Sequence, residues 1–330
     1  MGTKNVDDTV QTFIQPSKGW KIVDLRELAR YRELIFFLTW RDLKVRYKQT
    51  ILGVAWAVIQ PVLTMVVFSI FFGQFAGVPS DGLPYPLFSL AGLLPWQLFE
   101  NSLRTASRSL VTNRNMITKI YFPRVVLPLS SVLACIVDFF VALPILILMM
   151  VYYRYSPNIY ALLIPYYLLL TVVTAFGVSL WFSAMDVLYR DIGYVVPFIT
   201  QLWMYLTPIA YGYGMITDPK LQFLYSLNPM VGVVNGFRSS LLGEYAGLPL
   251  QSMLFSAVIS ILILVSGLIY FRRMEKQFAD DQTVDVYAED GDITIDIDVT
   301  DLTEDELATI MGNTMSAGVR SVTSISMVIS

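Results

Sequence analysis

The sequence contains no histidine and only one cysteine, Cys135. Without histidine, the chain has neither the commonest zinc ligand nor the serine–histidine pair of many hydrolases. A single cysteine excludes a disulfide within the chain. The phosphate-binding loop G-x-x-x-x-G-K-[ST], the turn G-x-G-x-x-G and any Cys/His metal-binding set are missing as well. We therefore expect no catalytic, cofactor-binding or metal-ligating residues in this chain.

Charged residues are also scarce. They make up 15% of the 330 residues, against about 25% in a typical soluble domain, whereas 55% are hydrophobic. The uncharged stretches form six long runs with at most one charge each, at residues 51–75, 83–103, 125–153, 155–185, 192–217 and 245–271. About 20 apolar residues in a helix cross a membrane, and in lipid the backbone must satisfy its own hydrogen bonds. The runs predict an all-α integral membrane protein with six transmembrane helices.

The distribution of lysine and arginine sets the expected orientation. With a cytoplasmic N-terminus, 19 bases fall in the inner segments around the six runs and only Arg154, Lys220 and Arg238 in the outer ones. Because bases concentrate on the cytoplasmic side, both ends of the chain are expected there. The bases follow membrane sidedness rather than an aromatic-basic groove, so we expect no nucleic-acid partner.

Three regions follow from this pattern. Residues 1–49 form a cytoplasmic N-terminal segment, residues 50–278 a six-helix transmembrane domain, and residues 279–330 a cytoplasmic tail. From Asp280 to Ser330 the tail has 12 acidic residues and one base. Its alternating sequence DITIDIDVT predicts a short strand. The pattern leaves open whether the tail is disordered or a small appended element.

Two segments fit neither a span nor a plain loop. In residues 24–50 apolar side chains share one helical face, which predicts an amphipathic helix in the cytoplasmic membrane interface, in contact with lipid headgroups. The alternative is a basic stop before the first span. In residues 218–244, Asn228 followed by Pro229 is a typical helix start. This outer segment predicts a re-entrant helical hairpin between the fifth and sixth spans, with a surface hairpin as the alternative.

Two features could line a channel. Asp138 lies inside the third run, where an unpaired carboxylate is costly, so it needs a partner or a water-filled cavity. A hydrogen-bonded contact between helices is the alternative. Aromatic residues form the second feature, with helical spacing in the first run and clustering in the fifth, and packing or an interfacial aromatic belt is the alternative. These channel-lining candidates are Phe68, Phe71, Phe72, Phe75, Asp138, Trp203 and Tyr205.

Two short cytoplasmic loops could contact a soluble motor. The loop VTNRNMITKIYFPR is short and basic, and Asn113 is placed to start a helix in it. The loop DVLYRDIG offers a second contact. A short rigid helix between two spans can pass motion from a motor to a membrane domain, although a plain turn is the alternative in each case.

The segments RDLKVRYKQTILGVAWAVIQP, LLPWQLFENSL, NRNMITKIYFPRVVLPLS, YRDIGYVVPFITQLWMYLTPIAY and LNPMVGVVNGFRSSLLG follow one another in order. Together they resemble the permease subunit of bacterial ABC exporters for O-antigen and related polysaccharides, over about residues 20–280. The resemblance does not separate O-antigen from capsule or teichoic-acid exporters. The acidic tail departs from the family pattern.

The resemblance implies an assembly and a set of roles. Two copies of the permease would pair with two copies of an ATP-binding subunit that holds ATP and Mg²⁺, in the bacterial inner membrane. The substrate would be an undecaprenyl-linked glycan. The implied gate-helix residues are Leu25, Arg26, Leu28, Arg30, Tyr31 and Arg41. The implied contacts with the ATPase are Asn113, Arg114, Asn115, Met116, Ile117, Lys119, Tyr121, Asp186, Tyr189, Arg190 and Asp191. The implied periplasmic gate contains Asn228, Pro229, Asn235, Phe237 and Arg238.

Two other functions are weighed against an exporter of polysaccharide. One is a related exporter of drugs or small lipids, which the aromatic residues and the outer hairpin disfavour. The other is a membrane-bound glycosyl- or acyltransferase. Such an enzyme needs polar catalytic residues near one interface, and the sequence offers only Glu100, Asp186 and Asp191 in separate loops.

Overall fold

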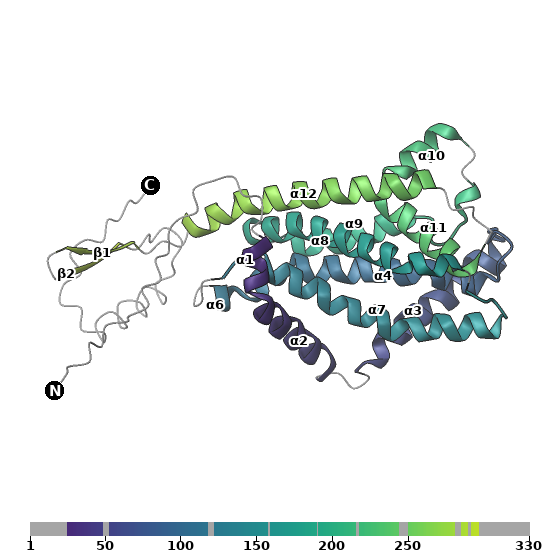
Figure 1. Ribbon diagram of the computed structural model, residues 1–330, viewed down its shortest axis with the longest axis horizontal. Helices are drawn as coiled ribbons and strands as arrows, with labels where there is room; N and C mark the ends of the chain where they lie inside the picture. Colours follow the sequence, from purple (N-terminus) through teal and green to yellow (C-terminus); the bar gives the residue numbers. More distant parts are fainter. Residues whose placement is uncertain are drawn as a thin grey trace, which may run out of the picture. The chain divides into compact units, whose positions relative to one another are not determined.

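The computed structural model describes residues 25–48, 53–117, 122–157, 159–189, 191–215, 218–243, 250–280, 285–289 and 292–296 (Figure 1). The chain divides into two units, Met1–Ile269 and Tyr270–Ser330. The first unit is helical. Its elements are α1 (Leu25–Arg30), α2 (Arg32–Lys48), α3 (Ala55–Phe68), η1 (Ser69–Phe75), α4 (Tyr85–Ser107), α5 (Ser109–Thr112), α6 (Arg114–Ile117), α7 (Val126–Tyr152), η2 (Ile159–Leu163), α8 (Ile164–Leu188), α9 (Ile192–Tyr205), η3 (Tyr213–Met215), α10 (Pro219–Ser226), α11 (Pro229–Leu242) and the first part of α12 (Leu250–Asp280).

Four helical segments among the described residues are long and apolar enough to cross a membrane. They are Ala55–Phe75, Val126–Tyr152, Ile159–Leu188 and Met253–Glu275. They coincide with the first, third, fourth and sixth uncharged runs. The second run forms α4, which is long enough to cross but has a polar second half. The coarse prediction of a helical membrane protein is therefore confirmed.

The fifth run departs from the prediction of one helix over residues 192–217. Helix α9 ends at Tyr205, after 14 residues. At about 1.5 Å per residue it is roughly 21 Å long, short of a hydrocarbon core of about 30 Å. Pro208 explains the early end, because proline has no N–H and biases the preceding residue, Thr207, away from helix. The chain then turns, and the Tyr211 hydroxyl donates to the Tyr205 carbonyl at 3.1 Å.

Helix α4 forms the centre of the first unit. It packs against α3, α7, α8, α9 and α11. Figure 1 shows α4, α7, α8 and α9 running alongside one another, with α2 oblique to them. Large side chains on α4, including Phe88, Trp96 and Phe99, are fully buried. The polar side chains in the second half of this helix are only half-buried, as at Gln97 and Asn101, or exposed, as at Arg104.

Helix α11 is also internal. Every residue from Pro229 to Leu242 is buried, against α4, α8 and η2. A glycine makes this packing possible, because a Cβ on Gly236 would lie 2.1 Å from the ring of Tyr167. Helix α11 is therefore covered by the rest of the protein, whereas Phe223 and Leu224 of α10 are exposed.

The predicted aromatic stripe on the first span is split. Residues 69–75 form a π-helix, in which the backbone N–H of Ala76 bonds to the carbonyl of Phe71, five residues earlier, at 2.9 Å. Because a π-helical turn holds more residues than an α-helical turn, residues three apart, such as Phe68 and Phe71, are turned away from a common face. Phe68 pairs with Phe72 and is 7% exposed, whereas Phe71 pairs with Phe75, and these are 58% and 79% exposed. The interpretation of one common stripe is wrong.

The N-terminal helix is interrupted at Tyr31, between α1 and α2, where the sequence predicts a single helix. On α2, Leu38 is fully buried, while Phe36, Phe37 and Trp40 are exposed. The exposed aromatic side chains suit a helix lying in a membrane interface.

The second unit contains a two-stranded hairpin. β1 (Asp285–Glu289) pairs in antiparallel register with β2 (Asp292–Asp296), so that Val286 faces Ile295 across the pair. The predicted strand in the tail is confirmed, and the chain is not purely α-helical. The remainder of the predicted tail element lies outside the described residues.

Candidate functional site

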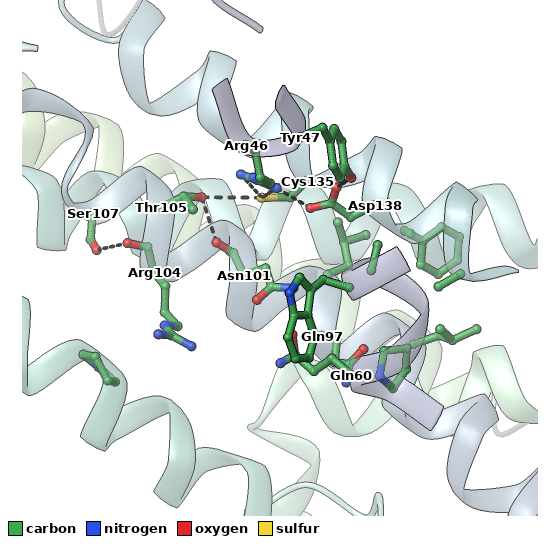
Figure 2. Close-up of a pocket in the computed structure, with 18 of the residues that line it drawn as sticks. Arg46, Tyr47, Gln60, Gln97, Asn101, Arg104, Thr105, Ser107, Cys135 and Asp138 are labelled. Atoms are coloured by element: carbon green, nitrogen blue, oxygen red, sulfur yellow. Dashed lines mark hydrogen bonds and ion pairs between the residues drawn. The ribbon is translucent and has the colours of Figure 1, made fainter. Parts of the chain in front are cut away.

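A cavity of about 440 Å³ opens between α2, α3, α4, α7 and α9 (Figure 2). Its walls come from the second half of α4 and from the first halves of α3, α7 and α9. In the orientation predicted from the sequence, these parts belong to the cytoplasmic half of the protein. The volume is within the range of small-molecule sites, roughly 300–1,000 Å³.

One face of α4 supplies most of the polar lining. Gln97, Asn101, Arg104, Thr105 and Arg108 border the cavity. Steps of three and four residues place these side chains on one side of a helix. Figure 2 shows Arg104 pointing away from α4 into the open space. Helix α4 therefore presents a strip of amides and guanidinium groups to the cavity.

Two smaller contributions complete the far walls. Helix α3 adds Trp56 and Gln60, and Figure 2 shows Gln60 near Gln97. Helix α9 adds the backbone at Gly193, where a Cβ would lie 2.2 Å from the Arg108 guanidinium. A side chain at this position would push the Arg108 guanidinium aside, so the backbone of α9 and this arginine lie in close contact.

An ion pair closes the cavity on the α2 side. Arg46 of α2 binds the carboxylate of Asp138 on α7, which also accepts a hydrogen bond from the Tyr47 hydroxyl. Burial and the bond to Asp138 raise the pKa of Tyr47, so the phenol stays a neutral donor. Burial alone would lower the pKa of Arg46, but Cys135 and Asp138 raise it overall. Asp138 is thus held by a cation and a hydroxyl in the cavity wall.

The same pair belongs to a polar seam between α2 and α7. The Thr39 hydroxyl approaches the Ser130 carbonyl at 3.4 Å, and the Ser131 hydroxyl donates to Asp42 at 3.3 Å. With Arg46 and Asp138, these contacts follow helical spacing along both helices. The seam fixes α2 along the first half of α7.

The lining combines three arginines with one aspartate, together with three amides. It is donor-rich and carries a positive balance. The described lining has no pair of carboxylates and no activated nucleophile, and no group of three acidic, cysteine or histidine residues in the described part could hold a metal. The guanidinium and amide donors suit binding of a polar, anionic molecule.

The other channel candidates lie elsewhere in the protein. Trp203 packs edge-on against Phe99 at 5.0 Å and donates to Asn228 at 3.0 Å. Tyr205 is exposed at the end of α9, and Phe72 packs against the core. Of the predicted channel set, only Asp138 borders the cavity.

The predicted gate-helix residues fall on α1, the break and α2. Leu28 and Tyr31 are half-buried, whereas Arg30 is exposed. Arg41 forms an ion pair with its neighbour Asp42 at 2.8 Å. Leu25 and Arg26 lie in α1, and their side chains are outside the described set. None of the four gate-helix residues with described side chains borders the cavity, which α2 reaches through Arg46 and Tyr47 instead.

The predicted motor contacts are described in part. Helix α6 starts at Arg114, directly after Asn113, whose carbonyl accepts from the N–H of Met116 at 2.9 Å. Arg114 and Asn115 are exposed, and Met116 and Ile117 are half-buried. Lys119 and Tyr121 lie outside the described residues, so the helix predicted to start at Asn113 is described only to Ile117.

The second predicted contact loop is partly internal. Asp186 is buried near Arg108 and accepts a hydrogen bond from the backbone N–H of Gly193. Tyr189 and Asp191 are exposed. Arg190 lies outside the described residues. Asp186 therefore ties the end of α8 to the start of α9, beside the cavity.

The predicted outer gate contains two residues that organise their surroundings. Asn228 caps α11 by accepting from the N–H of Met230 at 3.0 Å, and it donates to Thr207 at 3.1 Å. Arg238 is 4% exposed, although its position predicts an outer-loop base. Asn235 and Phe237 are buried on the same helix.

Arg238 donates its hydrogen bonds to backbone carbonyls. Its guanidinium donates to the carbonyls of Phe88, Pro208 and Ile209 at 3.1–3.2 Å and lies 3.6 Å from the centre of the Phe88 ring. This side chain joins α11 to α4 and to the turn after α9.

Reasoning from the sequence missed most of the cavity. Gln60, Gln97, Asn101, Arg104 and Arg108 were not among the expected site residues. A signal for them exists in the polar residues that recur every three or four positions in the second half of the second run. That periodicity predicts one polar helical face within an otherwise apolar span.

Comparison with known proteins places these features in context. A family model described as ABC-2 type transporter matches residues 33–242. The chain is 29% identical over 258 residues to the O-antigen export system permease protein RfbA of Myxococcus xanthus, covering 78% of this chain and 98% of that protein. It is 30% identical over 249 residues to the protein of the same name from Klebsiella pneumoniae, covering 75% and 94%. Over 244 residues it is 23% identical to the polysialic acid transport protein KpsM of Escherichia coli, covering 72% and 91%.

Proposed function

The chain belongs to the ABC-2 type transporter family, and on this premise we propose that it is the membrane-spanning permease of an ATP-driven polysaccharide exporter. The observation that carries the proposal is the similarity to O-antigen export permeases along 94–98% of their length. The polar cavity inside an apolar helical unit supports it, because a hydrophilic cargo needs such a surface within the membrane.

The energy source would lie in another protein. The sequence has no phosphate-binding loop, so we propose that ATP and Mg²⁺ bind to a separate ATP-binding subunit. Two copies of that subunit would join two copies of this chain, with the channel between the two permeases. This chain would contribute transport and no catalysis of its own.

The proposed placement is the bacterial inner membrane, with both termini in the cytoplasm. The four long apolar helices support membrane insertion. We propose that α4 and the α9 region complete a set of six spans, with α10 and α11 re-entering from the periplasmic side. The excess of inner over outer bases supports this orientation.

Motion from the ATP-binding subunit would enter through α6. Its exposed Arg114 and Asn115 lie at the inner end of the bundle in this topology. Asp186 and Asp191 would form the second contact. A push on these loops would be transmitted to α4, α8 and α9, which surround or adjoin the cavity.

The substrate proposed for this chain is a lipid-linked glycan of the O-antigen type. Capsule and teichoic-acid glycans are further members of the same substrate class. The similarity to a polysialic acid transport protein extends the proposal to acidic polysaccharides. A drug or small-lipid exporter has no comparable support among the relatives.

A deletion strain tests the proposal. We expect loss of the glycan from the cell surface and accumulation of its lipid-linked form inside, both reversed by expressing the chain. Unchanged surface glycan in the deletion strain would refute the proposal. Glycolipid conversion by the purified chain, without ATP or a partner, would replace it with the transferase alternative.

A further inference from the structure

The arginines of the cavity differ in how they are paired. Arg46 is engaged by Asp138. Arg104, in the last turn of α4, and Arg108, directly after the helix, are exposed and have no ion pair within 4 Å in the part of the chain that the structure describes. Each arginine has an acidic residue in its surroundings, Glu100 for Arg104 and Asp186 for Arg108, but forms no ion pair with it. The positive charge that no carboxylate pairs directly therefore lies at the end of α4.

The amides follow these arginines along the same helix face. Asn101 and Gln97 lie one and two turns before the charged end, and Gln60 faces them from α3. From Arg108 to Gln97 is roughly 16 Å along the axis, at about 1.5 Å per residue. A ligand that bridges this strip would meet guanidinium groups at one end and neutral donors at the other.

This order matches the chemistry of a glycan carried on a lipid. A glycan joined to its anchor by a phosphate or pyrophosphate ester presents an anion beside a sugar, and guanidinium groups bind phosphate through paired N–H donors. We propose that Arg104 and Arg108 form a subsite for that phosphate group, and that Asn101, Gln97 and Gln60 face the adjoining sugar. The inference rests on the proposed function and names the part of the substrate that this cavity holds.

The cavity volume favours this occupant over a free phosphate ion. Liquid water occupies about 30 Å³ per molecule, so about 440 Å³ holds far more than one small anion. The remaining space is lined by amides and by Trp56, a pattern suited to a sugar.

Binding to the purified full chain tests the subsite. In phosphatidylcholine nanodiscs, undecaprenyl pyrophosphate, undecaprenol and phosphatidylglycerol would be compared by native mass spectrometry. We expect the double substitution Arg104→Gln with Arg108→Gln to weaken undecaprenyl pyrophosphate at least tenfold, on the order of one lost charged hydrogen bond, and to leave undecaprenol unchanged. Arg32→Gln removes an exposed inner charge outside the cavity and should change neither affinity.

A second measurement uses the unsubstituted chain and does not depend on how the variant folds. Inorganic pyrophosphate should displace undecaprenyl pyrophosphate but not undecaprenol. Failure of displacement, or equal binding of undecaprenyl pyrophosphate to the double variant and the unsubstituted chain, would overturn the subsite. Phosphatidylglycerol binding as tightly as undecaprenyl pyrophosphate would do so too, since it would identify an ordinary lipid site.

Export in the deletion strain separates the two proposals. If the unsubstituted chain restores surface glycan while the double variant binds undecaprenyl pyrophosphate normally, the subsite is wrong and the exporter stands. If the unsubstituted chain and the Arg32→Gln control restore export in full, and the double variant restores less, the subsite is supported.

Discussion

Replacing Asp138 with leucine should destabilise the chain more than replacing Asp138 and Arg46 together. The two side chains are 14% and 29% exposed. Removing one partner of a buried pair costs about 3–5 kcal/mol because the other charge is left uncompensated. Since both side chains retain some exposure, we take the lower end, about 3 kcal/mol for each of Asp138→Leu and Arg46→Met.

The double variant leaves no stranded charge. In this variant the Tyr47 hydroxyl loses Asp138, the group to which it donates, and this loss costs about 1–2 kcal/mol. Two independent changes would cost about 6 kcal/mol, so we expect a coupling free energy of about 4 kcal/mol. This coupling measures how firmly α2 is held against α7 at the cavity.

The free energy of unfolding would be obtained by titrating SDS into mixed micelles of the full chain and following tryptophan fluorescence. The control cycle uses Arg41→Met and Asp42→Leu, a neighbouring pair on α2 at 2.8 Å. Its greater exposure predicts a coupling below about 1 kcal/mol. Additive costs for Arg46 and Asp138, within about 0.5 kcal/mol, would refute the reasoning.

Three further predictions concern other contacts. Arg238→Met should lower the free energy of unfolding by at least about 3 kcal/mol, because three buried carbonyls lose their donor; a loss below 1 kcal/mol in the same titration would contradict the clamp. Gly236→Ala should lower the free energy of unfolding by about 1–3 kcal/mol, because it forces a Cβ into the ring of Tyr167. As a control, a Cβ at Gly77 meets no atom within 4 Å, so Gly77→Ala should show only the backbone strain of its positive φ. If Gly236→Ala costs no more than Gly77→Ala, α11 is not packed as an internal helix. Arg114→Glu should reduce glycan export while ATP hydrolysis by the assembled complex continues; unchanged export would remove α6 as the coupling element.

Much of the helical framework could be predicted from the sequence. The third and fourth uncharged runs became α7 and α8 because long apolar segments in lipid have only the helix available. Asn228 and Pro229 start α11 as predicted, since a side-chain cap and a fixed φ act locally. Such local rules need no knowledge of the rest of the chain.

Contacts between distant residues could not be predicted in this way. Arg46 and Asp138 are 92 positions apart, so the partner of a costly carboxylate was expected but not identifiable. Arg238 was counted as a base of an outer loop, although its side chain is buried and donates to three backbone carbonyls. Local geometry also differed, since the π-helix at residues 69–75 separated Phe68 from Phe71.

The cavity itself falls between these two cases. The sequence shows the regular spacing of the polar residues on α4, but each residue taken alone could simply lie close to a loop at the end of the span. Only the packing of α2, α3, α7 and α9 around α4 brings Gln60, Arg46 and Asp138 to the same space. Tertiary structure is required to turn a periodic pattern into a site.

The most direct test of the exporter proposal is reconstitution of the full chain with an ATP-binding subunit in proteoliposomes loaded with a lipid-linked glycan. With the ATP-binding surface facing outward, ATP should move the glycan from the outer leaflet to the interior, where an added glycosidase no longer reaches it. Protection should require both proteins and ATP hydrolysis. Glycan that stays fully accessible, or that becomes protected without the ATP-binding subunit, would contradict the account.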